Sequence, residues 1–143
     1  MRSEPTLDHK DAKAAIDAIS AELDRRGKAA VAVVVDSHGE ALALVRHSGT
    51  MLSSIAVATN KAYTAARLRR PSQMVGKRVR DPDNGFDIAY YGDPRYVGWG
   101  GGLPVERDGQ VLGAVGVSGL PEAEDIELAQ LGIAAIEARI KAG

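Results

Sequence analysis

The sequence contains no cysteine, and this absence excludes several kinds of site at once. Disulfides, thiolate nucleophiles and cysteine-ligated zinc or iron–sulfur centres all require the missing side chain. No apolar run approaches the ~20 residues that a membrane-spanning helix needs. The first residues also lack the apolar segment of a secretory signal. We therefore expect a cytoplasmic protein with no membrane partner.

Aromatic residues are scarce, since the 143 residues include one Phe, one Trp and four Tyr. A core with so few rings must be built from Ala, Val, Ile and Leu, and a sheet-wide aromatic platform for nucleic-acid bases is excluded. Charge of one sign is also lacking, because 18 basic and 19 acidic residues leave a net charge of −1. No overall field therefore attracts nucleic acid or anionic lipid.

The apolar patterning predicts one α+β domain that spans residues 1–143. Hairpins near both ends favour an antiparallel sheet with helices packed on it, and the first two strands are apolar throughout, so we expect a sheet covered on both faces. A further strand inside residues 81–102 is left open. Helical spacing predicts a first helix that Thr6 or Asp8 caps and Gly27 ends, and further helices over 51–70 and 73–79 and from residue 121 onward. Apolar and β-branched runs predict strands over 29–36, 41–47, 103–107 and 110–118.

Five of the six aromatic residues lie inside the Gly- and Pro-rich segment 81–102, where they span only fourteen residues. A connection this long in a small domain is usually a binding loop or a lid, although its rings could simply seal the core. Gly100, Gly101 and Gly102 follow Trp99 and leave backbone amides approachable, as an oxyanion would require. They match neither a P-loop nor a dinucleotide-binding fingerprint.

Seven cations and no acid occupy residues 61–80, whereas four of the seven residues over 121–127 are acidic. Three interpretations stay open: a phosphate or carboxylate site, complementary patches between subunits, or two solvated helix faces. His9, His38 and His47 are far apart and form no metal-binding pair, so we predict no metal site. His47 ends a strand beside Arg46, at a position where a pocket could open.

Several segments together resemble one known family. They are VAVVVDSHGEALALVRHSGT, SSIAVATNKAYTAARLRRPS and GGLPVERDGQVLGAVGVSGLPEAED, followed by ELAQLGIAAI. The combination resembles the GlcG/HbpS-like family, also called haem-degrading-like, which includes the carboxy-terminal domain of PduO-type adenosyltransferases. The resemblance covers about residues 6–140.

The resemblance implies a profilin-like fold with a five-stranded antiparallel sheet and assembly into homo-oligomers. It also implies that haem is a candidate ligand, because some members bind haem or iron. Two departures stand out: Arg46-His47-Ser48 replaces the usual Arg-Met-Asp, and residues 71–100 are unusually rich in rings. The family positions that map here, mostly as framework or pocket lining, are Asp36, Lys61, Tyr63, Thr64, Gly101, Gly102, Pro104, Gly116, Gly119 and Asp125.

Two functional hypotheses follow, with an unliganded scaffold as a third. The first is a homo-oligomeric protein that binds a small planar or anionic molecule such as haem, with no cofactor required. The second is a cofactor-independent lyase, hydratase or isomerase acting on a small carboxylated metabolite. In the second, Arg46, Lys61 or Arg67 would hold the carboxylate, the amides of residues 100–102 would stabilise an oxyanion beside Trp99, and His47, Tyr63, Tyr91 or Glu106 would move protons.

Overall fold

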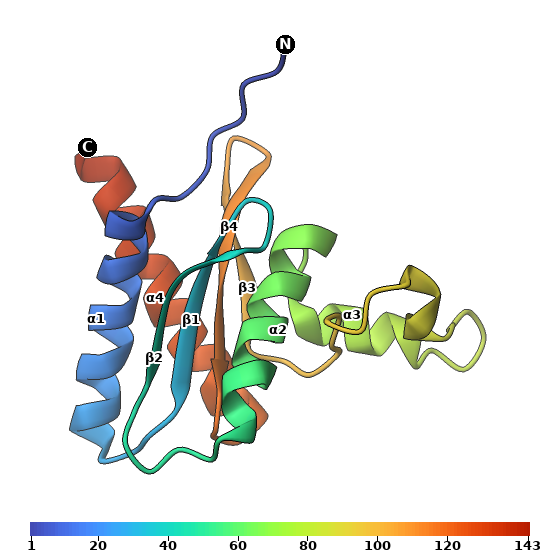
Figure 1. Ribbon diagram of the computed structural model, residues 1–143, viewed down its shortest axis with the longest axis horizontal. Coiled ribbons are helices and arrows are strands. Elements are labelled where there is room, and N and C mark those ends of the chain that lie inside the picture. The colour runs from blue at the N-terminus through green and yellow to red at the C-terminus, as the bar shows by residue number, and fades with distance from the viewer.

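The computed structural model describes all residues 1–143 as an antiparallel sheet between two layers of helix. The strand order is β2-β1-β4-β3. Helices α1 (His9–Arg26) and α4 (Glu122–Ala142) cover one face, and α2 (Ser53–Leu68) covers the other (Figure 1). The α+β class and the antiparallel pairing are confirmed. No helix is long and apolar enough to cross a lipid bilayer.

Helix α1 begins where the sequence places its cap. The side chain of Asp8 accepts hydrogen bonds from the amides of Lys10 and Asp11, and the amide of Asp8 donates to the carboxylate of Asp11. This capping box satisfies backbone donors that have no partner inside the helix. The helix ends at Gly27 in the left-handed conformation, with φ 64°.

The two central strands form the middle of the core. β1 (Val31–Asp36) pairs with β4 (Gln110–Ser118), and the alternate side chains of β1 contribute to the apolar clusters on opposite faces. Gly116 of β4 lies directly under α2, where an added Cβ would stand 2.3 Å from the carbonyl oxygen of Ala58. The small residue therefore allows the helix to pack closely on the sheet.

Strand β2 (Ala41–Arg46) is less covered than its apolar sequence predicts. It is an edge strand, and α2 packs on β1, β3 and β4 rather than on it. Leu44 is consequently 41% exposed. The expectation of a sheet covered on both faces is therefore wrong at this edge.

The segment between α2 and β3 (Gly102–Arg107) contains no strand, so the sheet has four strands where the family resemblance implies five. It contains α3 (Ser72–Val79) and a short 3-10 helix, η1 (Ile88–Tyr91). The side chain of Asp87 caps η1 and Gly92 ends it with φ 70°, so local turn bonds replace strand pairing. We call residues 72–99 the arm, because this segment projects from the sheet and helices (Figure 1).

Candidate functional site

The end of the arm that returns to the sheet is fastened to α2 through Tyr63. The Tyr63 side chain is only 1% exposed, and its hydroxyl donates a hydrogen bond to the carboxylate of Asp93. The next residue of α2, Thr64, accepts the amide of Val97 at 2.9 Å. The ring of Tyr96 lies 5.3 Å from that of Tyr63. Together these contacts hold residues 93–97 against the helix.

Two arginines lie against the ring of Tyr63. The guanidinium of Arg95 is 4.0 Å from the ring centroid and that of Arg67 is 5.0 Å away. Burial, with the carboxylate of Asp93 adding to it, raises the pKa of Tyr63 to about 12. The hydrogen bond from Tyr63, together with bonds from Arg95, lowers the pKa of Asp93 to about 2. At neutral pH Tyr63 is therefore a protonated donor and Asp93 an ionised acceptor.

Rings and arginines of the arm meet at a small cavity. Phe86 lies 5.9 Å from Tyr91 between ring centroids, and Tyr91 lies 5.0 Å from Tyr96. The guanidinium of Arg78 is 5.8 Å from the centroid of Phe86. Beside these rings is a cavity of about 50 Å³, which we call the arm cavity. It is lined by Leu68, Arg70, Val75, Arg78, Phe86 and Tyr91.

The cations of residues 67–80 form no ion pair within the chain. Neither Arg70 nor Arg78 has a carboxylate within ion-pair distance. The acids at the start of α4, in contrast, pair with the end of α1: Glu124 lies 2.7 Å from Lys28, and Glu127 lies 3.0 Å from Arg26. The acidic segment is therefore neutralised within one chain, which leaves the basic segment free to meet an external anion.

The three consecutive glycines lie in a crowded place, and two of their three amides are bonded within the chain. The amide of Gly100 donates to Glu122 at 3.0 Å, and that of Gly102 donates to the hydroxyl of Ser72 at 2.9 Å. A Cβ on Gly102 would stand 2.1 Å from the carbonyl oxygen of Lys61. In this conformation the glycines serve close packing between the arm, α2 and β3.

Lys61 is buried in an ion pair. Its side chain is 4% exposed, and its ammonium donates to Asp125 at 3.1 Å and to the carbonyl of Val117 at 2.9 Å. The other carboxylate oxygen of Asp125 accepts the amide of Leu120 at 3.1 Å. Burial raises the pKa of Asp125, and the nearby Lys61 ammonium opposes part of that rise. This pair ties α2 to the start of α4.

The remaining residues that the sequence analysis singled out lie apart from the arm cavity. His47 follows β2, and its ring nitrogens bond to the carbonyl of Ala30 at 2.7 Å and to the hydroxyl of Ser20 at 2.9 Å. Arg46 is exposed at the end of β2, and Glu106 is exposed on the edge strand β3. The structure therefore does not bring His47, Arg46 and Glu106 together with Tyr63.

Other exposed apolar groups lie along the arm. Tyr90 is 84% exposed, Trp99 60%, Met74 54% and Tyr91 43%. The hydroxyl of Ser72 donates to the carbonyl of Trp99 at 2.7 Å, which holds Trp99 next to the start of α3. The arm thus combines a cavity containing arginines with exposed rings outside it.

Comparison with known proteins finds a matching family model and several similar proteins. The family model described as haem degrading protein HbpS-like matches residues 7–134. The chain belongs to the HbpS-like family. An uncharacterized 15.0 kDa protein of the dhaT-dhaS intergenic region in Citrobacter freundii is 37% identical over 97 residues, or 68% of each chain. Protein GlcG of Escherichia coli K12 is 32% identical over 118 residues, covering 82% of this chain and 85% of GlcG.

The resemblance to PduO and to HbpS-like structures is likewise confirmed. The corrinoid adenosyltransferase PduO of Salmonella typhimurium is 30% identical over 106 residues, which are 74% of this chain and only 32% of PduO. Klebsiella pneumoniae protein ORFY superposes with a TM-score of 0.91 at 29% identity, covering 96% and 95% of the two chains. A crystal structure of a PduOC:haem complex superposes with a TM-score of 0.83 at 26% identity, covering 91% and 94%.

Sequence reasoning missed several residues that contact Tyr63 and His47. Asp93 and Arg95 complete the environment of Tyr63, and Ser20 engages His47. Asp93 precedes a proline in a turn-forming run, which indicated a turn but not its long-range partner. Arg70 and Arg78 were noted only as part of a basic run, since helical spacing alone does not place them beside Phe86.

Proposed function

We propose that this HbpS-like protein binds a planar, anionic small molecule at the arm cavity, and that haem is the first candidate. The observation that carries the proposal is the meeting of Arg70 and Arg78, which have no carboxylate partner, with the rings of Phe86 and Tyr91. Guanidinium groups bind carboxylates through paired hydrogen bonds, and aromatic rings stack on flat faces. Haem offers both, as a flat macrocycle with two carboxylates.

The size of the cavity limits how such a ligand fits. A volume of about 50 Å³ accommodates a carboxylate group but not a macrocycle. The macrocycle would therefore lie outside it, against exposed rings of η1 such as Tyr90 and Tyr91. Haem iron takes His, Met, Cys or Tyr as a protein ligand, so Tyr90 and Tyr91 are the candidates on η1. When bound, haem would supply an iron centre capable of one-electron chemistry.

The relatives supply independent support. The PduOC structure is described as a haem complex, and its fold closely matches this chain. His47 is a weaker candidate for the haem ligand than the tyrosines of η1, because both of its ring nitrogens already have partners.

We also propose that the protein is a homo-oligomer. The open face of β2 exposes Leu44, and the connection to α2 exposes Met51 at 74% and Leu52 at 68%. Exposed apolar groups of this size commonly mark an interface. Replacing Met51 and Leu52 together by Glu should lower the molar mass measured by light scattering, whereas the same change at the exposed Met74 should not.

The enzyme hypothesis stays a prediction with less support. It requires acid–base groups gathered beside a carboxylate site, but Lys61 pairs with Asp125 and Tyr63 donates to Asp93. Glu106 is exposed to solvent on the edge strand β3. A lyase or isomerase activity on small hydroxy acids that Tyr63→Phe abolishes would favour it.

The proposal is tested by titrating haemin into the purified protein and following the Soret band. We expect a saturable shift in the wild type and a dissociation constant at least about tenfold higher in Arg70→Ala/Arg78→Ala. Arg107→Ala is the matched control, since Arg107 is an exposed arginine on β3. No shift in the wild type, or the same affinity in the double variant, overturns the proposal; loss of the shift in His47→Ala would place the ligand at His47 instead.

A further inference from the structure

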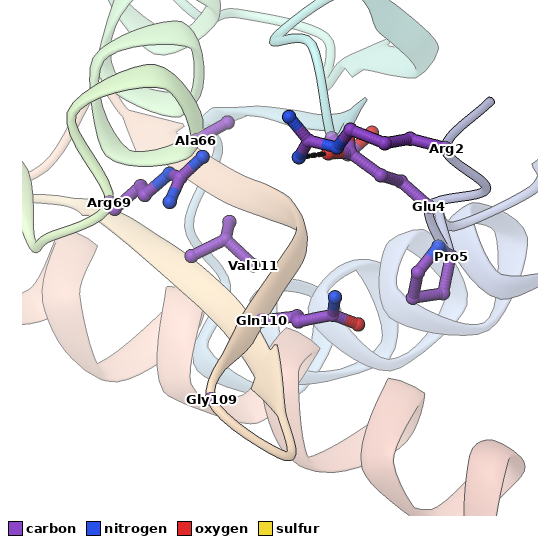
Figure 2. A pocket seen from close by; sticks show the side chains of 9 residues that line it. Arg2, Glu4, Pro5, Ala66, Arg69, Gly109, Gln110 and Val111 are labelled. Atoms are coloured by element: carbon purple, nitrogen blue, oxygen red, sulfur yellow. Dashed lines mark hydrogen bonds and ion pairs between the residues drawn. The ribbon is translucent and has the colours of Figure 1, made fainter.

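A second cavity, separate from the arm cavity, lies at the end of the molecule where several chain segments converge. Its volume is about 110 Å³. The carboxyl end of α2, the β1–β2 turn, the β3–β4 turn and the residues before α1 form its walls (Figure 2). Arg2, Glu4, Ser37, Arg69 and Gln110 contribute its polar side chains. We call it the turn cavity.

The backbone at Arg69 indicates that this side chain has a role. Arg69 ends α2 in the left-handed conformation, with φ 58° and ψ 38°. Helix α1 ends in nearly the same conformation at Gly27, with φ 64° and ψ 35°. Left-handed geometry is unfavourable for a residue with a Cβ and costs glycine nothing comparable. An arginine at a position suited to glycine therefore implies a benefit that its side chain provides.

No partner within the chain accounts for that benefit. The Arg69 guanidinium takes part in no ion pair, unlike Arg2, which pairs with Glu4. Figure 2 shows the side chain of Arg69 extending toward the space between Val111 and Arg2. An arginine that points into a cavity without an anionic partner is available to bind an external anion.

The other polar groups of the turn cavity favour the same ligand class. Arg2 and Arg69 bring two positive charges against the single negative charge of Glu4, and Ser37 and Gln110 add neutral hydrogen-bond donors. We propose that the turn cavity binds a small oxyanion, a phosphate or short carboxylate group, with Arg69 as its principal ligand.

The residues before α1 form the wall opposite Arg69 and are anchored near it. The amide of Leu7 donates to the carbonyl of Leu112 at 2.9 Å, and the hydroxyl of Thr6 accepts the amide of Ser37 at 3.0 Å. An anion held by both Arg69 and Arg2 would therefore join this anchored segment to α2. Binding of this kind stabilises the folded state, because the unfolded chain does not assemble the site.

Two consecutive arginines line the two cavities. Arg69 lines the first and Arg70 the second. This adjacency allows the two proposals to be tested separately by changing one arginine at a time.

The experiment measures the thermal midpoint in sodium phosphate, in sodium malonate and in sodium chloride of matched ionic strength. For the wild type we expect phosphate, malonate or both to raise Tm by roughly 5 °C at saturation relative to chloride. A rise in one salt alone identifies the anion class. The exposed control Arg107→Ala should keep the rise.

Two variants of Arg69 complete the test. Arg69→Gly should lose the anion-dependent rise while its Tm in chloride equals or exceeds that of the wild type, because glycine relieves the left-handed backbone. Arg69→Met, which keeps the Cβ and removes the charge, should lose the rise without that gain. No rise in the wild type, an unchanged rise in Arg69→Met, or a lower Tm of Arg69→Gly in chloride would overturn the proposal.

Discussion

The hydroxyl of Tyr63 in α2 donates a hydrogen bond to the carboxylate of Asp93, which lies 30 residues further along the chain in the arm. Arg95 reinforces this contact from above the Tyr63 ring, at 4.0 Å from its centroid. The pair fixes the point at which the arm returns to the sheet, and therefore positions the arm cavity relative to α2.

Removing the hydroxyl should loosen the arm. We expect Tyr63→Phe to lower Tm by roughly 3–5 °C, because a buried donor to an ionised acceptor is lost while the ring is retained. Limited proteolysis should show faster cleavage within residues 80–92. Tyr90→Phe is the control, since Tyr90 is 84% exposed. Equal Tm and equal cleavage in the two variants would show that the bond does not restrain the arm.

The same pair predicts how stability depends on pH. The pKa of Asp93 falls from 3.8 to about 2 on folding. Its contribution to the free energy of unfolding is therefore present above pH 4 and lost as pH falls toward 2. The pKa of Tyr63 rises from 10.0 to about 12, so its contribution is present below pH 10 and lost as pH rises toward 12. Urea unfolding of the wild type should show a loss of stability at low pH and another at high pH. Asp93→Asn should remove the loss at low pH, and Tyr63→Phe should remove the loss at high pH.

The buried ion pair between Lys61 and Asp125 predicts a strong coupling. We expect Lys61→Met to cost about 3 kcal/mol, because it leaves a buried carboxylate without its cation. Adding Asp125→Asn should restore part of that loss, since the amide oxygen still accepts the Leu120 amide. A double-mutant cycle from urea unfolding measures the coupling. Additive losses would mean that the two groups act independently.

The glycine before β3 is predicted to be required for packing rather than for turn geometry alone. An added Cβ on Gly101 would lie 2.6 Å from the carbonyl oxygen of Val117, whereas one on Gly49 would meet nothing within 4 Å. Both positions have positive φ, so strain is common to them. Gly101→Ala should cost about 3 kcal/mol and Gly49→Ala about 1 kcal/mol. Similar losses of stability in the two variants would indicate that the backbone at Val117 shifts to accommodate the added Cβ.

Much of the fold follows from local sequence signals. Gly27 ends α1 as predicted, and Asp8, one of the two predicted caps, begins it. The apolar run in β1 lies in the centre of the sheet. The predictions from sequence were wrong where contacts between distant segments determine the structure. β2 has an apolar sequence but lies at an edge that α2 does not cover. The end of α2 lies at Leu68 rather than at the residue before Pro71, because Arg69 adopts the left-handed conformation.

The candidate site was less accessible to sequence reasoning. The concentration of rings in residues 81–102 drew attention to the segment whose Phe86 and Tyr91 line the arm cavity. The glycines suggested an oxyanion site, but the amides of Gly100 and Gly102 are bonded to Glu122 and Ser72, and neither partner is near them in sequence. Arg70 and Arg78 became candidates only when the fold brought Phe86 beside them.

The central claim is that the guanidinium groups of the arm cavity recognise the carboxylates of a planar ligand. The most direct measurement compares the affinities for haemin and for haemin dimethyl ester, in which both carboxylates are masked, by Soret titration. We predict that the wild type binds haemin at least about tenfold more tightly than the ester, and that Arg70→Ala/Arg78→Ala removes this preference. Equal affinity of the wild type for the two compounds, or a preference that persists in the double variant, would contradict the claim.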